Sequence, residues 1–171
     1  MKTPPWRVGI TLLALLALLA SLILPSMAPQ PSSSVADGHL APCPDSPNCV
    51  CSQDTRPGHH IDALPYSGEP AVALARLKDL VQREPRTRIV ETSQQYLRAE
   101  FRSRVFRFVD DVEFLADPAR GVIEVRSASR VGYSDMGVNR RRMEHLRSLF
   151  LAGAANPGAA PKTPSGSPTA R

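Results

Sequence analysis

Alternating apolar and polar residues between positions 96 and 127 constrain the fold of this 171-residue chain more than any other feature. Leu97, Ala99 and Phe101 fall on one face of an extended strand, while the residues between them are polar or charged. From residue 106 the apolar phase shifts by one position. The new inward row is Phe106, Phe108, Asp110, Val112 and Phe114. Because a one-residue slip exchanges the faces of a strand, we expect a tight turn or a bulge near residues 103–105.

Two shorter segments extend this strand pattern. Residues 88–92 have the composition of a short strand. Residues 117–121 have the composition of a hairpin turn, and 122–127 should form the last strand. The pattern therefore predicts an antiparallel sheet of three or four strands.

Two helices are expected to flank the strands. Residues 69–84 carry apolar side chains at helical spacing, with Pro70 suited to the first turn. A second helix should be capped by Ser134 or Asp135 and run to about Phe150. The predicted fold is α+β, with both helices packed on one face of the sheet and the order α-β-β-β-β-α.

The amino-terminal segment predicts export. Lys2 and Arg7 precede an apolar run from Val8 to Leu24, and a small-x-small pattern follows at 26–28. We expect residues 1–28 to be a cleaved signal peptide or a retained transmembrane anchor. Positive charges before the run place the rest of the chain outside the cytoplasm, in the periplasm or anchored to the inner membrane of the cell envelope.

Composition divides the remaining chain into three parts. A Pro/Ser-rich linker at 29–42 precedes a single globular domain at 43–150, and 151–171 reads as a disordered low-complexity tail. The chain has a net charge of +5. The domain itself contains 17 Arg and Lys against 15 Asp and Glu, a net charge of +2. Because acids alternate with the arginines, we expect no nucleic-acid partner.

The three cysteines lie together at the domain entrance, in CPDSPNCVC. A bridge between Cys43 and Cys49 would close a seven-residue loop in the oxidising compartment that export implies. A bridge between Cys49 and Cys51 is less favourable geometrically. Either bridge leaves one of the three cysteines unpaired. The alternative is a metal site that combines the thiols with nearby histidines, but the spacing matches no standard zinc motif, and no metal is assigned.

A dense polar motif, RSASRVGYSDMGVNR, occupies residues 126–140. Asp110 falls in the apolar row of the preceding strand, and a buried carboxylate requires a cationic partner or several N–H donors. We expect that partner among Arg126, Arg130 and Arg140. The candidate binding residues are Asp110, Asp111, Arg126, Ser127, Ser129, Arg130, Tyr133, Ser134, Asp135, Asn139 and Arg140.

The motif supports three interpretations. It can be a structural salt bridge that holds sheet and helix in register, with Asp111 and Glu113 solvated on the other face. It can bind a carboxylate or phosphate at the free N–H groups of the second helix, beside Arg130 and Tyr133, unless Asp135 fills that position as the cap. It can also do acid–base chemistry, although neighbouring carboxylates on a strand point to opposite faces, and the serines lack a nucleophile-elbow motif.

The quoted segments resemble one family. CPDSPNCV, FRFVDDVEF at 106–114 and RSASRVGYSDMGVNR look like the family catalogued as domain of unknown function 1499, over about residues 40–150. The resemblance implies bacterial exported or membrane proteins and plant plastid proteins, with no established activity, cofactor or ligand. The pattern carries over to Cys43, Asn48, Cys49, Asp110, Asp111, Arg126, Ser127, Ser129, Arg130, Gly132, Ser134, Asp135, Gly137, Asn139 and Arg140. Because family members commonly have serine where this chain has Cys51, the resemblance favours the Cys43–Cys49 bridge.

The sequence thus predicts an exported or membrane-anchored envelope protein that acts as a binding or interaction module through its Asp/Arg/Ser site. The expected partner is a small anionic ligand or an envelope protein, with contact to the membrane through residues 8–24 if they are retained. No cofactor is expected. The alternative is a small hydrolase-like enzyme that uses the same constellation.

Overall fold

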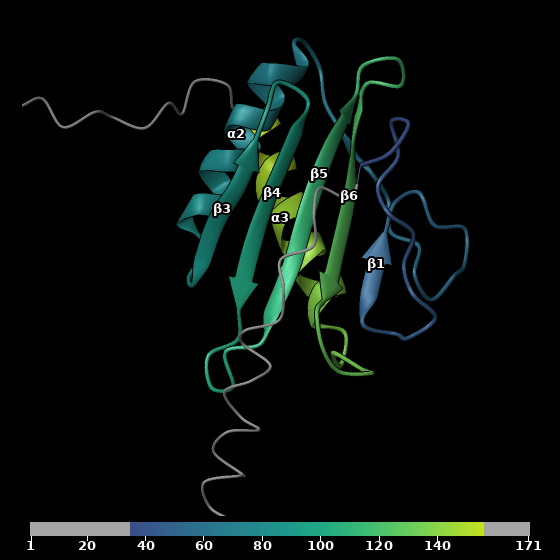
Figure 1. Cartoon of the computed structure of the whole chain (residues 1–171). Helices are drawn as coiled ribbons and strands as arrows, with labels where there is room; N and C mark the ends of the chain where they lie inside the picture. Colours follow the sequence, from purple (N-terminus) through teal and green to yellow (C-terminus); the bar gives the residue numbers. More distant parts are fainter. Residues whose placement is uncertain (1–34, 156–171) are drawn as a thin grey trace, which may run out of the picture.

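The computed structural model describes residues 35–155 (Figure 1). The predicted signal peptide or anchor at 1–28, and the part of the predicted tail after residue 155, lie outside the described residues. Within residues 35–155, no helix has both the length and the apolar character needed to span a membrane. Residues 35–42 of the predicted linker are described, and Leu40 among them is buried in a small apolar cluster.

All the described strands belong to one antiparallel sheet. The long strands pair in the order β6-β5-β4-β3, and they are β3 (Thr87–Thr92), β4 (Tyr96–Arg102), β5 (Val109–Asp117) and β6 (Val122–Ser129). Two short strands, β1 (Cys49–Cys51) and β2 (Leu64–Pro65), pair with the other edge of β6. The predicted number of three or four strands is therefore too low, because strands of two or three residues are too short to show a periodicity.

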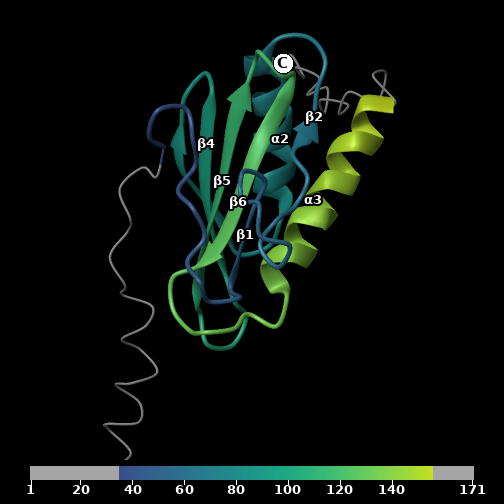
Figure 2. The ribbon, with the colours of Figure 1, turned by 90° about the vertical axis from the view of Figure 1, so that its right-hand side faces the viewer.

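Two helices, α2 (Pro70–Arg83) and α3 (Val138–Ala155), lie behind the sheet in Figure 1 and on one side of it in Figure 2. Pro70 occupies the first turn of α2, where its missing N–H leaves no helical hydrogen bond unmade. The class is α+β, but β1 and β2 precede α2. Over residues 35–155 the predicted order α-β-β-β-β-α is therefore corrected to β-β-α-β-β-β-β-α.

The main hydrophobic core fills the space between the helices and the sheet. Leu97 of β4 and Phe114 of β5 pack there with Leu77 of α2 and Leu146 of α3, and all four are fully buried. Residues of the other parity point to the opposite face of the sheet. That face carries charged side chains and a second apolar cluster that includes Leu115.

The β4–β5 and β6–α3 loops lie at the same end of the sheet, below the strands in Figures 1 and 2. The β4–β5 loop falls where the phase shift predicted a turn. It is closed by Ser103, whose hydroxyl oxygen accepts the backbone N–H of Phe108 at 2.9 Å. The prediction that Phe106 and Phe108 face the core is wrong: both are exposed, because β5 begins only at Val109.

Candidate functional site

The predicted polar motif is divided between the two faces of the sheet. On β5, Asp110 points toward the helices and Asp111 points away, because successive residues of a strand alternate. On β6, Ser127 pairs across the strands with Val112 and faces the helices, whereas Arg126 pairs with Glu113 on the opposite face. Asp110 and Asp111 therefore cannot act together as a carboxylate dyad.

Asp110 is neutralised by Arg142 of α3, with 2.6 Å between Oδ2 of the carboxylate and Nη2 of the guanidinium. The prediction that Arg126, Arg130 or Arg140 would supply this guanidinium is wrong. Arg126 and Arg130 bind carboxylates on the opposite face of the sheet. Arg140 donates to a backbone carbonyl at 3.1 Å. The partner comes from the helix itself because β5 turns Asp110 toward the helix layer.

Asn139, one of the candidate binding residues, is fully buried at the start of α3. Its side-chain oxygen accepts hydrogen bonds from the Ser127 hydroxyl and from Arg142, both at 2.6 Å. Its side-chain nitrogen donates to the carbonyl of Asn48 at 2.9 Å and to the Ser129 hydroxyl at 3.0 Å. One amide thus joins α3 to β6 and to the segment before β1, which gives this part of the motif a structural role.

Asp135 caps α3. Its two carboxylate oxygens accept the backbone N–H groups of Gly137 at 2.9 Å and of Asn139 at 2.7 Å. The hydroxyl of the neighbouring Ser134 accepts the N–H of Met136. The position at which the sequence predicted that an external anion could dock is therefore occupied by a carboxylate of the chain itself.

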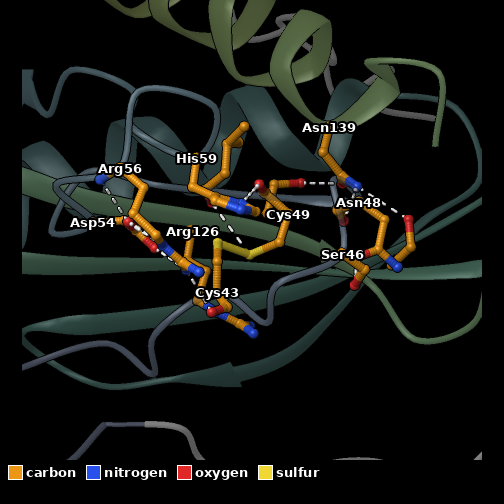
Figure 3. The surroundings of a disulfide bond; sticks show 12 residues. Cys43, Ser46, Asn48, Cys49, Asp54, Arg56, His59, Arg126 and Asn139 are labelled. Atoms are coloured by element: carbon orange, nitrogen blue, oxygen red, sulfur yellow. Dashed lines mark hydrogen bonds and ion pairs between the residues drawn. A yellow bond between two sulfur atoms is a disulfide. The ribbon is translucent and has the colours of Figure 1, made fainter. Parts of the chain in front are cut away.

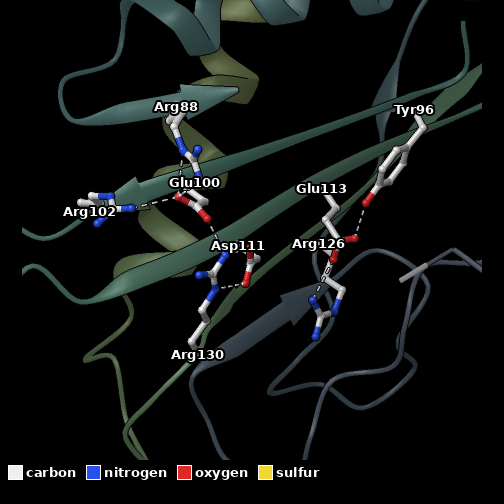
Figure 4. A network of polar contacts seen from close by, with 8 residues as sticks. All are labelled: Arg88, Tyr96, Glu100, Arg102, Asp111, Glu113, Arg126 and Arg130. Carbon is white, nitrogen blue, oxygen red and sulfur yellow. Dashed lines mark hydrogen bonds and ion pairs between the residues drawn. The ribbon is translucent and has the colours of Figure 1, made fainter. Parts of the chain in front are cut away.

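The opposite face of the sheet carries a buried network of ion pairs (Figure 4). The guanidinium of Arg130 donates two hydrogen bonds to Asp111, at 2.7 and 2.8 Å, and one to Glu100 at 2.7 Å. Glu100 also accepts hydrogen bonds from Arg88 and Arg102. The hydrogen bond to Asp111 is the main reason why the pKa of Arg130 lies above its usual range. The expectation that Asp111 would be solvated is wrong, because it is almost fully buried.

A second group of the same network is built around Glu113, which was also expected to be solvated and is buried. Its carboxylate accepts a hydrogen bond of 2.5 Å from the Tyr96 hydroxyl and one of 2.8 Å from Arg126. Burial, together with the hydrogen bond to Glu113, raises the pKa of Tyr96 far above its usual value. These contacts cross β4, β5 and β6 and hold the three strands in register.

The cysteine region lies beside this face (Figure 3). Cys43 and Cys49 form a disulfide with an S–S distance of 2.00 Å, which confirms the predicted bridge. The disulfide takes two of the three thiols on which a metal site would depend. Cys51 is free and buried, and burial raises the pKa of its thiol. Among residues 35–155, no three His, Cys, Asp or Glu side chains are grouped so that they could hold a metal ion.

A cavity of about 350 Å³ opens between the β4–β5 and β6–α3 loops. Its polar lining comes from Ser103 on the first loop, from Asp110 and Ser129 on the strands, and from Ser134 and Asp135 on the second loop. The rest is Phe108, Val131, Gly132 and Val138. The cavity thus collects residues from two of the three sequence segments that carry the family resemblance. Of the candidate binding residues, the seven that do not line it are Asp111, Arg126, Ser127, Arg130, Tyr133, Asn139 and Arg140.

Two important side chains were missed in the sequence. Arg142 lies three residues after Asn139, which places both on the side of α3 that faces the sheet, and this spacing was a usable signal. Glu100 shares the alternating pattern with Arg98 and Arg102, but nothing in the sequence shows that this polar face is buried.

Fold and site together define a small disulfide-bonded α+β domain that is braced by buried ion pairs and has a cavity at one end of its sheet. The chain belongs to the family described as "Protein of unknown function (DUF1499)", whose model matches residues 39–150. A comparison with curated proteins gave no match.

Proposed function

We propose that this chain is an exported or membrane-anchored binding module, and that its ligand enters the cavity between the β4–β5 and β6–α3 loops. The apolar run and the cleavage-like pattern of residues 1–28 support export, and the Cys43–Cys49 disulfide is compatible with an oxidising compartment. The cavity is the main support for the proposal. Residues of the 126–140 motif could have had a purely structural role, but several of them line an opening to solvent.

The chemistry of the cavity favours a neutral amphipathic ligand over the anion expected from the sequence. Phe108, Val131 and Val138 provide an apolar wall. Asp110 and Ser129 provide hydrogen-bond acceptors at its polar side, while the arginines of the motif are bound elsewhere. A volume of about 350 Å³ lies at the small end of the range for ligand pockets. A molecule with an apolar body and one or two N–H or O–H donors would fit.

The hydrolase-like alternative finds less support in this geometry. Ser129 and Ser134 line the cavity, but the imidazole of His145 pairs with Glu84, 3.0 Å away, rather than with either serine. The Asp110 carboxylate likewise pairs with Arg142, 2.6 Å away, rather than with a serine or a histidine.

A fluorescent titration tests the binding function. N-phenyl-1-naphthylamine is neutral, has an apolar body and one N–H donor, and becomes fluorescent in apolar surroundings. We expect saturable binding to the full chain, weakened at least tenfold when Val131→Trp fills the cavity. Val105→Trp is the matched control, because Val105 is exposed on the same end of the domain but does not line the cavity. Equal titrations for the two variants, both folded by circular dichroism, would contradict the proposal.

A further inference from the structure

The loop end of the domain exposes large apolar side chains from both loops. Phe106 on the β4–β5 loop is 53% exposed, and Tyr133 and Met136 on the β6–α3 loop are 76% and 87% exposed. Val105 and Val138 are also exposed. Single exposed apolar residues are ordinary on a protein surface, but a group of this size at one end indicates an interaction surface.

These side chains surround one opening. The ring of Phe106 stacks on that of Phe108 with 5.5 Å between centroids, and Phe108 lines the cavity. Val138 and the segment that carries Tyr133 lie across the same cavity on the β6–α3 loop. The two loops therefore present their apolar side chains around a common mouth, at the end of the sheet seen below the strands in Figure 2.

The charge around this mouth is positive. The exposed arginines of this end are Arg86, Arg104, Arg107 and Arg141. The two carboxylates that line the cavity are already engaged, since Asp110 pairs with Arg142 and Asp135 caps α3. Exposed aromatic and aliphatic groups among arginines form the combination that binds the interface of an anionic bilayer.

We propose that this end of the domain docks on the surface of a membrane that contains anionic phospholipids. The side chains of Phe106, Tyr133 and Met136 enter the headgroup region, and the arginines contact lipid phosphates. The apolar run Val8–Leu24 is separated from residue 35 by ten residues, which can span up to about 35 Å. Residue 35 of a domain anchored by that run would therefore stay within this distance of the bilayer. This inference goes beyond the binding function and does not depend on it.

Depth-dependent fluorescence quenching tests the docking. The chain contains a single tryptophan, Trp6, so Trp6→Phe removes the natural signal. Into this background we place Phe106→Trp or Met136→Trp, and as a matched control Leu151→Trp, which is also exposed but lies near the far end of α3. Each full-length chain is reconstituted in vesicles of brominated phosphatidylcholine with or without 30% phosphatidylglycerol.

We expect brominated lipid to quench tryptophan at 106 and at 136 more strongly than at 151 in the anionic vesicles, and 0.5 M salt to reduce the difference. The Arg104→Gln and Arg107→Gln substitutions should each lower the ratio of docked to undocked protein about fivefold. Equal quenching at all three positions would overturn the proposal. It would also be overturned if a short DNA duplex, and not the vesicles, changed the fluorescence of the tryptophan at 106, and if the Arg104→Gln and Arg107→Gln substitutions abolished that change.

Discussion

Replacing Arg130 with glutamine is expected to lower the free energy of unfolding by about 3–5 kcal/mol at pH 7. The Arg130 guanidinium makes its three hydrogen bonds to Asp111 and Glu100 at 2.7–2.8 Å. After the substitution Glu100 keeps Arg88 and Arg102, whereas Asp111, with 4% of its side chain exposed, loses the guanidinium that neutralises it. The expected loss is therefore that of one orphaned buried carboxylate rather than the sum of three bonds.

Urea denaturation followed by circular dichroism, with the disulfide intact, measures this loss. In a thermal scan it corresponds to a decrease in Tm of about 10–20 °C. Arg88→Gln is the matched control, because Arg88 binds the same Glu100 but has 57% of its side chain exposed. We expect this control to cost less than about 1 kcal/mol.

A second substitution separates a buried charge from lost packing. Asp111→Asn removes the charge of the orphaned carboxylate, so the Arg130→Gln, Asp111→Asn double variant should recover part of the stability that Arg130→Gln loses. A cost below about 1 kcal/mol for Arg130→Gln, or no recovery in the double variant, would refute the view that this face of the sheet is held by desolvated ion pairs.

Three further predictions concern other parts of the domain. Asp110→Asn and Arg142→Gln should each lower stability by about 2–3 kcal/mol, and in a double-mutant cycle by urea denaturation the double variant should lose less than their sum. Cys51 should resist iodoacetamide at pH 8 in the folded chain and react fully in urea, as read by mass spectrometry, because burial raises the pKa of its thiol. The raised pKa of Tyr96 contributes stability that is complete below about pH 10 and is lost as the pH rises further. Urea denaturation between pH 9 and 11 should therefore show a fall in stability that Tyr96→Phe diminishes.

The strand pattern shows which parts of the sheet the alternation of apolar and polar residues can predict. Alternation placed Leu97, Ala99 and Phe101 on the core face, and the phase shift located the β4–β5 connection, because burial on one side imposes a two-residue period. The same reasoning failed for Phe106, since a run of apolar residues in a loop looks like a continuation of the strand. It also could not show that the polar face, with Glu100 and Glu113, is almost as buried as the core.

The ion pair of Asp110 shows what the sequence pattern could not predict. A carboxylate at position 110 in an apolar row required a guanidinium, and that requirement was correct. Which arginine supplies it depends on where α3 crosses the sheet, and this placed Arg142, rather than Arg130, beside Asp110.

By itself the sequence determined the elements that arise from neighbours along the chain: the long strands, the two helices, the bridge between two nearby cysteines and the need to neutralise a buried acid. Only the tertiary structure decided which distant groups meet, because strand register and helix position bring together side chains that have no fixed relation in the sequence. The partners of each arginine, the cap that fills the helix end and the cavity between the two loops all arise at that level.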